Sequence, residues 1–242
     1  MKTVAVRWGE GQLAGLPEGA GVELGRLAEP GRLVEISGVG ASARHTTAVA
    51  LVRQAQLEGE TTAWVQPAGG PLYPPDLAES GVDLGALVVV HVPEDRGQVG
   101  LARAAELLLR SGAFGLCVVD LSVPEICPEG QVNLRPAAVI VCPEGQALSD
   151  MSPQPARPPR LKGGAWQARL AALARMHHSR VVVLTRSAGG RGSLGPMVGL
   201  RVDPRRERRA PGVFAVRPEI VKHKGAPLQA AATLRRGPWG LV

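Results

Sequence analysis

The chain has few cysteines, few aromatic residues and no long apolar run, and each shortage excludes a class of protein. Its three cysteines, Cys117, Cys127 and Cys142, show neither a disulfide framework nor a metal-ligand spacing, so we expect reduced thiols and no metal. The longest apolar runs, such as that from Leu87 to Val92, are far too short to cross a membrane. The N-terminus lacks the continuous apolar stretch of a signal peptide. We therefore expect a cytoplasmic protein without membrane contact.

Acidic residues are scarce in the second part of the chain. Residues 1–156 hold 10 Lys and Arg against 18 Asp and Glu, whereas residues 157–242 hold 18 against 3. Clustered charge attracts charge of the opposite sign, so the basic part indicates a nucleic-acid surface or an acidic protein partner. A solvated arginine-rich surface is the alternative.

Apolar periodicity alternates between strand and helix along most of the chain. Proline and glycine predict a loop over 67–75, and antiparallel strands are expected after residue 197. Residues 122–164 are rich in proline and repeat the sequence CPEGQ, which favours a loop or a small β excursion. The apolar run 87–92 is typical of a strand covered by helices on both faces. Strands are predicted at 31–37, 61–66, 87–92, 114–120 and 180–186, and helices at 46–59, 98–112 and 165–178.

This alternation predicts the fold class α/β: a mostly parallel central sheet flanked by helices, with antiparallel edge strands at the C-terminal end. We expect a single domain over residues 1–242. Its parts are a short N-terminal segment (1–30), the first βα units (31–120), a proline-rich insertion (121–164), and the remaining core with a basic C-terminal part (165–242).

The segment GVGASARHTT, residues 38–47, stands where a phosphate-binding loop is expected, between a strand and a helix. A working loop reads GxxxxGK[ST], because backbone amides wrap the phosphates, Lys neutralises them and the hydroxyl holds magnesium. Gly38 matches the first position, but Ala43, Arg44 and His45 replace the other three. In the neighbouring register Thr46 supplies the hydroxyl, but His45 then replaces the lysine.

The stretches around this loop resemble the RecA recombinases, in the same order along the chain. GRLVEISG precedes the loop and TTA follows it; LLRSGAFGLCVVDLSV, WQARLAALAR, RVVVLTR and IVKHKGAP follow in turn. The similarity covers residues 30–227. It implies a RecA-like core in which Asp120 takes the place of the magnesium-associated aspartate.

The departures from that family concern its catalytic and assembly parts. At the position of the family's general-base glutamate this chain has Ala68 or Gly69. At the position of the glutamine that couples nucleotide binding to DNA binding it has Arg186. The N-terminal arm for self-assembly is missing, so filaments should be lost or weak. We expect no enzyme activity and no cofactor, with a vestigial nucleotide site formed by Gly38, Ala43, Arg44, His45, Thr46 and Asp120.

Three alternatives remain open at this site. Asp120 either binds residual magnesium or caps the end of a strand. Arg44 and His45 either form a weak anion site at a helix N-terminus or belong to a neutral loop. A residual ATPase is a further alternative, which Ala43 and the absent glutamate argue against.

The chain resembles the ImuA family in three features: its eroded nucleotide site, its length and its basic C-terminal part. That resemblance implies a non-catalytic adaptor in the bacterial SOS response and error-prone translesion DNA synthesis, whose partners are an ImuB-type polymerase-like protein, an error-prone DNA polymerase and RecA. The alternatives are a SulA-like cell-division inhibitor and a salt-sensitive single-stranded DNA-binding protein.

Two groups of basic residues are candidate contacts with partners. Lys222 and Lys224 match two RecA lysines that reach the ATP of a neighbouring protomer, so we predict that they bind a RecA filament end; solvated lysines are the alternative. The candidate contacts with weakly bound DNA or an acidic partner are Arg191, Arg205, Arg206, Arg208, Arg209, Arg235 and Arg236. Aromatic residues make up only 3% of the chain, too few for an extended base-stacking surface.

Overall fold

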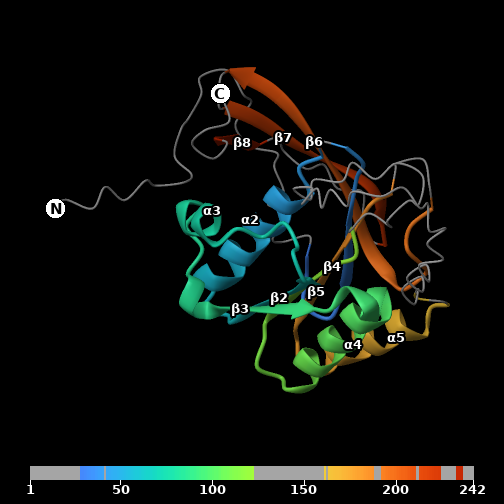
Figure 1. Cartoon of the computed structure of the whole chain (residues 1–242). Helices are drawn as coiled ribbons and strands as arrows, with labels where there is room; N and C mark the ends of the chain where they lie inside the picture. The colour runs from blue at the N-terminus through green and yellow to red at the C-terminus, as the bar shows by residue number, and fades with distance from the viewer. Residues whose placement is uncertain are drawn as a thin grey trace, which may run out of the picture.

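The computed structural model describes residues 28–40, 42–122, 161, 163–187, 192–210, 213–224 and 233–236. They form one eight-stranded sheet with helices on both faces (Figure 1). The strands are β1 (Leu33–Ser37), β2 (Thr62–Pro67), β3 (Leu87–Val92), β4 (Leu116–Asp120), β5 (Arg180–Thr185), β6 (Val198–Ala210), β7 (Val213–His223) and β8 (Thr233–Arg236). The helices are α2 (Arg44–Leu57), α3 (Pro74–Glu79), α4 (Gly97–Arg110) and α5 (Ala165–Met176).

The strands lie in the order β3-β2-β4-β5-β1-β6-β7-β8. Strands β3 to β6 in this order are parallel, whereas β6, β7 and β8 pair antiparallel. The predicted fold class is confirmed. The parallel order brings the C-terminal ends of β1, β2, β4 and β5 to one edge of the sheet, where α/β proteins bind their ligands.

Alternate side chains of each central strand enter two separate cores, because successive residues of a strand point to opposite faces. On one face Ile36 and Trp64 pack with Leu51 of α2. On the other face Val119 packs with Leu109 of α4 and Leu170 of α5 (Figure 1). The parallel strands between the helices are therefore apolar almost throughout.

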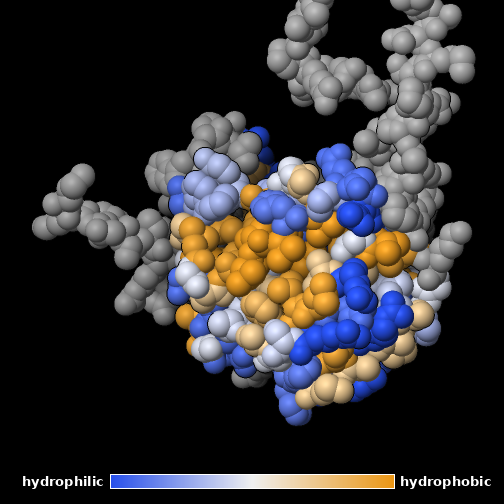
Figure 2. Space-filling view, turned by 60° about the horizontal axis from the view of Figure 1, so that its bottom comes forward, coloured by the Kyte–Doolittle hydropathy of each residue, from blue (hydrophilic) through white to orange (hydrophobic). Residues whose placement is uncertain are grey.

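The expectation that the strand at residues 87–92 is covered by helices on both faces is wrong for β3. Among the described residues it is the edge strand and pairs with β2 alone, and Val88 remains 46% exposed despite the apolar sequence. Figure 2 brings forward the side of the molecule on which β3 and α4 lie in Figure 1, and it shows a broad apolar area. We call Val88, Val90, Leu107 and Leu108 the edge patch; the first and third are exposed, and the others are partly buried.

The predicted loop 67–75 is also corrected at its end, where α3 begins at Pro74. Proline suits the first turn of a helix, because its missing N–H has no partner there, and Asp76 favours the same turn electrostatically.

Several predictions fall outside the described residues. These are most of the loop or β excursion at 122–164, with both copies of CPEGQ, and the candidate contact Arg191. Within the described part of the chain, no helix has the length and apolar character needed to span a membrane.

Candidate functional site

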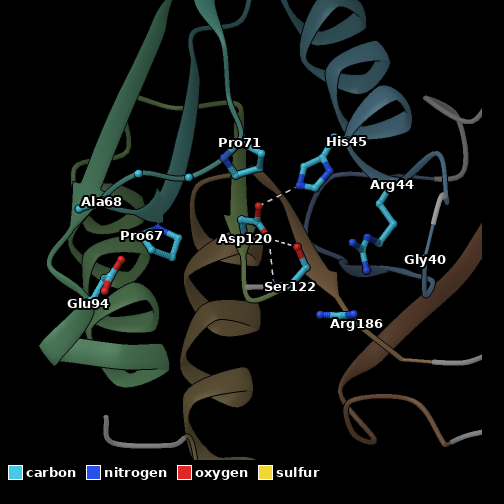
Figure 3. A pocket seen from close by; sticks show the side chains of 12 residues that line it. Gly40, Arg44, His45, Pro67, Ala68, Pro71, Glu94, Asp120, Ser122 and Arg186 are labelled. Carbon is cyan, nitrogen blue, oxygen red and sulfur yellow. Dashed lines mark hydrogen bonds and ion pairs between the residues drawn. The ribbon is translucent and has the colours of Figure 1, made fainter. Parts of the chain in front are cut away.

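An open cleft of about 430 Å³ lies at the C-terminal ends of the parallel strands. Its walls come from the loop after β1, the start of α2, the turn after β2 and the ends of β4 and β5. The lining residues include Arg44, His45, Ala68, Glu94, Asp120, Ser122 and Arg186 (Figure 3). The eroded loop therefore borders a cleft large enough for a small ligand.

Arg44 turns its guanidinium back onto its own loop. Its Nη1 donates to the carbonyl of Gly38, and also to the carbonyl of Thr185 at the end of β5, over 3.3 Å. The side chain is 9% exposed, and burial is the main cause that lowers its pKa, with the nearby charge of Arg186 adding to the effect. Arg44 is thus bound to protein carbonyls at the position where a phosphate-binding lysine would stand.

The backbone of the loop is likewise engaged. The N–H of Ala43 donates to the carbonyl of Pro204 in β6 over 3.0 Å, so this amide is not directed into the cleft. Gly38 has φ +153°, and an added Cβ would meet the Ser42 side chain at 2.7 Å, so glycine is required here. The amide of Ala43 and the side chain of Arg44 are therefore both used for bonds within the protein.

His45 binds the carboxylate of Asp120 across the cleft. His45 Nε2 lies 3.0 Å from Asp120 Oδ2, and the other oxygen accepts from the backbone N–H of Ser122 over 2.9 Å and from its hydroxyl (Figure 3). Both carboxylate oxygens are therefore occupied by protein donors. The serine hydroxyl contacts the carboxylate and not the imidazole, so this trio lacks the order of a nucleophile, base and orienting acid.

The candidate residues Arg44, His45 and Asp120 meet in the cleft as the sequence predicts, whereas Thr46 is exposed on the first turn of α2 and does not line it. The contribution of Ser122 was missed, although a serine two residues after an aspartate is a common signal for a side-chain turn. Two features of the cleft have no signal in the sequence. One is the contribution of Glu94 from the turn after β3. The other is the stacking of His45 on Trp64, whose ring centroids lie 6.4 Å apart.

A second polar cluster lies beside the cleft, between β1 and β6. Glu35 and Arg201 are each 1% exposed and lie 3.9 Å apart between Oε1 and Nε. Glu35 also accepts from the hydroxyl of Thr185 over 2.9 Å and from the N–H of Leu194 over 2.8 Å. This network joins the central sheet to the loop before β6.

Lys222 in β7 and Lys224, the residue after the end of β7, bind that same loop. Lys222 Nζ donates to Ser193 Oγ over 2.9 Å and to the carbonyl of Gly195 over 3.1 Å, and Lys224 Nζ donates to the carbonyl of Pro196. Burial lowers the pKa of Lys222, and the neighbouring Lys224 adds to this. Their contact with RecA stays a prediction, and it would have to replace these bonds.

The candidate arginines of the C-terminal part lie on the antiparallel strands. Arg205, Arg206 and Arg208 are exposed on β6. Arg209 also belongs to β6, and Arg235 and Arg236 belong to β8, where the register sets them opposite Phe214 and Val213. Of these residues, the three with described side chains, Arg205, Arg206 and Arg208, do not line the cleft.

The His45–Asp120 pair predicts a pH dependence of stability. Burial alone would raise the pKa of Asp120, but hydrogen bonds from His45 and Ser122 outweigh it, and the pKa lies below its usual range. Stability from this carboxylate is therefore complete above the unfolded-state pKa of about 4 and is lost as the pH falls through the lower folded-state pKa. We expect His45→Ala to lower the free energy of unfolding by about 1–3 kcal/mol at neutral pH. The acid-induced loss of the stability that Asp120 contributes should then begin at a higher pH.

Urea unfolding across a pH series measures this effect. The substitution Asp83→Asn, at an exposed residue, is the control. A His45→Ala profile parallel to that of the unchanged chain would show that the pair contributes nothing.

Comparisons with known proteins agree with the fold. Residues 18–141, just over half of the chain, match the family model described as the RecA N-terminal domain. The chain belongs to this RecA family. It is 34% identical over 141 residues to "Protein RecA" of Teredinibacter turnerae, covering 54% of this chain and 39% of that protein. It is 36% identical over 103 residues to that of Clostridium tetani, covering 43% and 28%. The chain thus spans well under half the length of these relatives.

Proposed function

We propose that this protein is a non-catalytic RecA-like adaptor of the bacterial SOS response and error-prone translesion DNA synthesis. Its proposed partners are an ImuB-type polymerase-like protein, an error-prone DNA polymerase and RecA. One observation carries the proposal: Arg44 and the His45–Asp120 pair use the phosphate-binding and metal-binding positions for bonds within the protein. The use of these positions for internal bonds favours protein binding over nucleotide chemistry as the role of the scaffold.

The edge patch supports a role in protein binding. It combines exposed apolar side chains with a strand that lacks a partner on its outer side in the described structure. An apolar surface of this kind beside an unpaired strand edge is typical of protein contact sites. We assign the polymerase-like partner to this surface.

Charged substitutions in the edge patch test the assignment. We expect Val88→Glu with Leu107→Glu to weaken binding of the purified ImuB-type protein at least about tenfold, because buried apolar contacts at an interface centre dominate affinity. Leu57→Glu with Met176→Glu is the matched control, since these side chains are 68% and 70% exposed and lie on other helices. Immobilised full-length protein and a titration of the partner provide the measurement. Equal affinity of both double variants and the unchanged chain would refute the assignment.

A further inference from the structure

Within the part of the chain that the structure describes, the outer half of β6 has a strand partner on one side only. Strand β1 pairs with β6 only as far as Val202, while β7 pairs with it to Ala210. Between Arg205 and Arg208, β6 therefore has a strand partner on one side only among the described residues. Figure 1 shows this ribbon of β6, β7 and β8 at the upper end of the molecule.

Two facing prolines fix which residues direct their backbone groups to that edge. Pro204 stands opposite Pro218 in the antiparallel register, and neither has an N–H, so they form a pair without mutual hydrogen bonds. The carbonyl of Pro204 agrees with this, because it points away from β7 and accepts from Ala43. Hydrogen-bonded and non-bonded pairs alternate, so Arg206 and Arg208 also turn their N–H and C=O groups to the free edge.

The arginines of the ribbon divide between its two faces. Arg205 lies 2.8 Å from Glu219 and Arg217 lies 3.8 Å from Glu207, so one face neutralises its own charge. On the opposite face, Arg206 lies over the ring of Phe214 at 4.3 Å from its centroid. Neither Arg206 nor Arg208 has a carboxylate partner within the described residues. Among the described residues, Arg206 and Arg208 thus combine backbone groups that have no strand partner with positive charges that have no carboxylate partner.

We propose that an extended acidic segment of a partner protein adds to β6 as a further strand, with its carboxylates opposite Arg206 and Arg208. Strand addition uses main-chain hydrogen bonds for affinity and side chains for selection. Like charges repel across neighbouring strands, so this edge rejects a second copy of itself and accepts an acidic strand. The ring of Phe214 is covered by Arg206, so the face offers no free aromatic surface for a nucleic-acid base.

The test uses the full chain and a fluorescent peptide of alternating Glu and Val, with anisotropy as the signal. We expect Arg206→Gln with Arg208→Gln to weaken binding at least about tenfold, since both charges face the peptide. Arg205→Gln with Arg217→Gln removes the same charge from the other face and should change the affinity less than about twofold. Equal losses in the two double variants, or no binding of the peptide, would overturn the proposal.

Methylated peptides test the strand pairing itself. N-methyl groups on those backbone amides of the peptide that face β6 should abolish binding. N-methyl groups on the other backbone amides, which face away from β6, should be tolerated. Equal effects of the two sets would refute strand pairing between the peptide and β6. Tighter binding of an oligothymidine that depends on Arg206 and Arg208 would assign the face to nucleic acid instead. The inference rests on the proposed adaptor role, but its failure leaves the edge patch titration unaffected, so the two can be told apart.

Discussion

Replacing Glu35 with alanine is expected to lower the free energy of unfolding by about 3–5 kcal/mol, because it removes the carboxylate that lies beside the buried charge of Arg201. Arg201 is 1% exposed, and its donors also reach the neutral hydroxyls of Ser37 and Ser187. The substitution also removes the acceptor for Thr185 and for the loop N–H of Leu194. Strand β6 and the loop before it should loosen together.

Chemical denaturation of the purified protein measures this loss. Glu35→Gln keeps an acceptor without the charge and should cost less than the alanine variant. Glu29→Ala is the control for a surface ion pair, since Glu29 is 56% exposed where it meets Arg32, and such pairs contribute at most about 1 kcal/mol. A loss for Glu35→Ala no larger than for Glu29→Ala would contradict the role given to this network.

Restoring the phosphate-binding loop is expected to create a nucleotide site. The triple substitution Ala43→Gly, Arg44→Lys and His45→Thr should bind ADP with magnesium at least about tenfold more tightly than the unchanged chain, a difference of about 1.4 kcal/mol. The lysine replaces a guanidinium that is bound to Gly38 and Thr185, and removal of the imidazole frees Asp120. Calorimetric titration with ADP measures the gain.

The restored loop should bind without hydrolysis, because Ala68 supplies no carboxylate to activate water. Ala68→Glu added to the triple variant is expected to produce phosphate release, and Asp120→Asn added to it should abolish the gain in affinity. Unchanged ADP binding in the triple variant would show that the side chains of Arg44 and His45 are not what closes the site.

The sequence predicted the parts of this protein that depend on local patterns. Apolar periodicity located strands β1 to β5 and helices α2, α4 and α5 but not the short helix α3, and the spacing from Gly38 to His45 pointed to residues that border the cleft. It failed where tertiary neighbours decide. The run 87–92 looks like a buried strand, but its exposure depends on its place at the edge of the sheet.

Charged residues inside strands are a sequence signal for buried ion pairs, but they do not show which residues pair. Glu35 interrupts the apolar strand β1, and Arg201 stands in β6, yet only the parallel register sets them side by side. Arg44 and His45 were recognised as departures from a phosphate-binding loop, but their bonds to Thr185 and Asp120 join segments far apart in the chain. Such pairs follow from the order of strands, which no local pattern specifies.

Phosphate release from ATP by the unchanged full-length protein, with magnesium and single-stranded DNA present, tests the central claim most directly. The internal bonds of Arg44, His45 and Asp120 predict a rate equal to the blank, and rates of Asp120→Asn and Glu94→Gln that are indistinguishable from it. Release above the blank that is lost in Asp120→Asn would show a working nucleotide site and would contradict a purely protein-binding role.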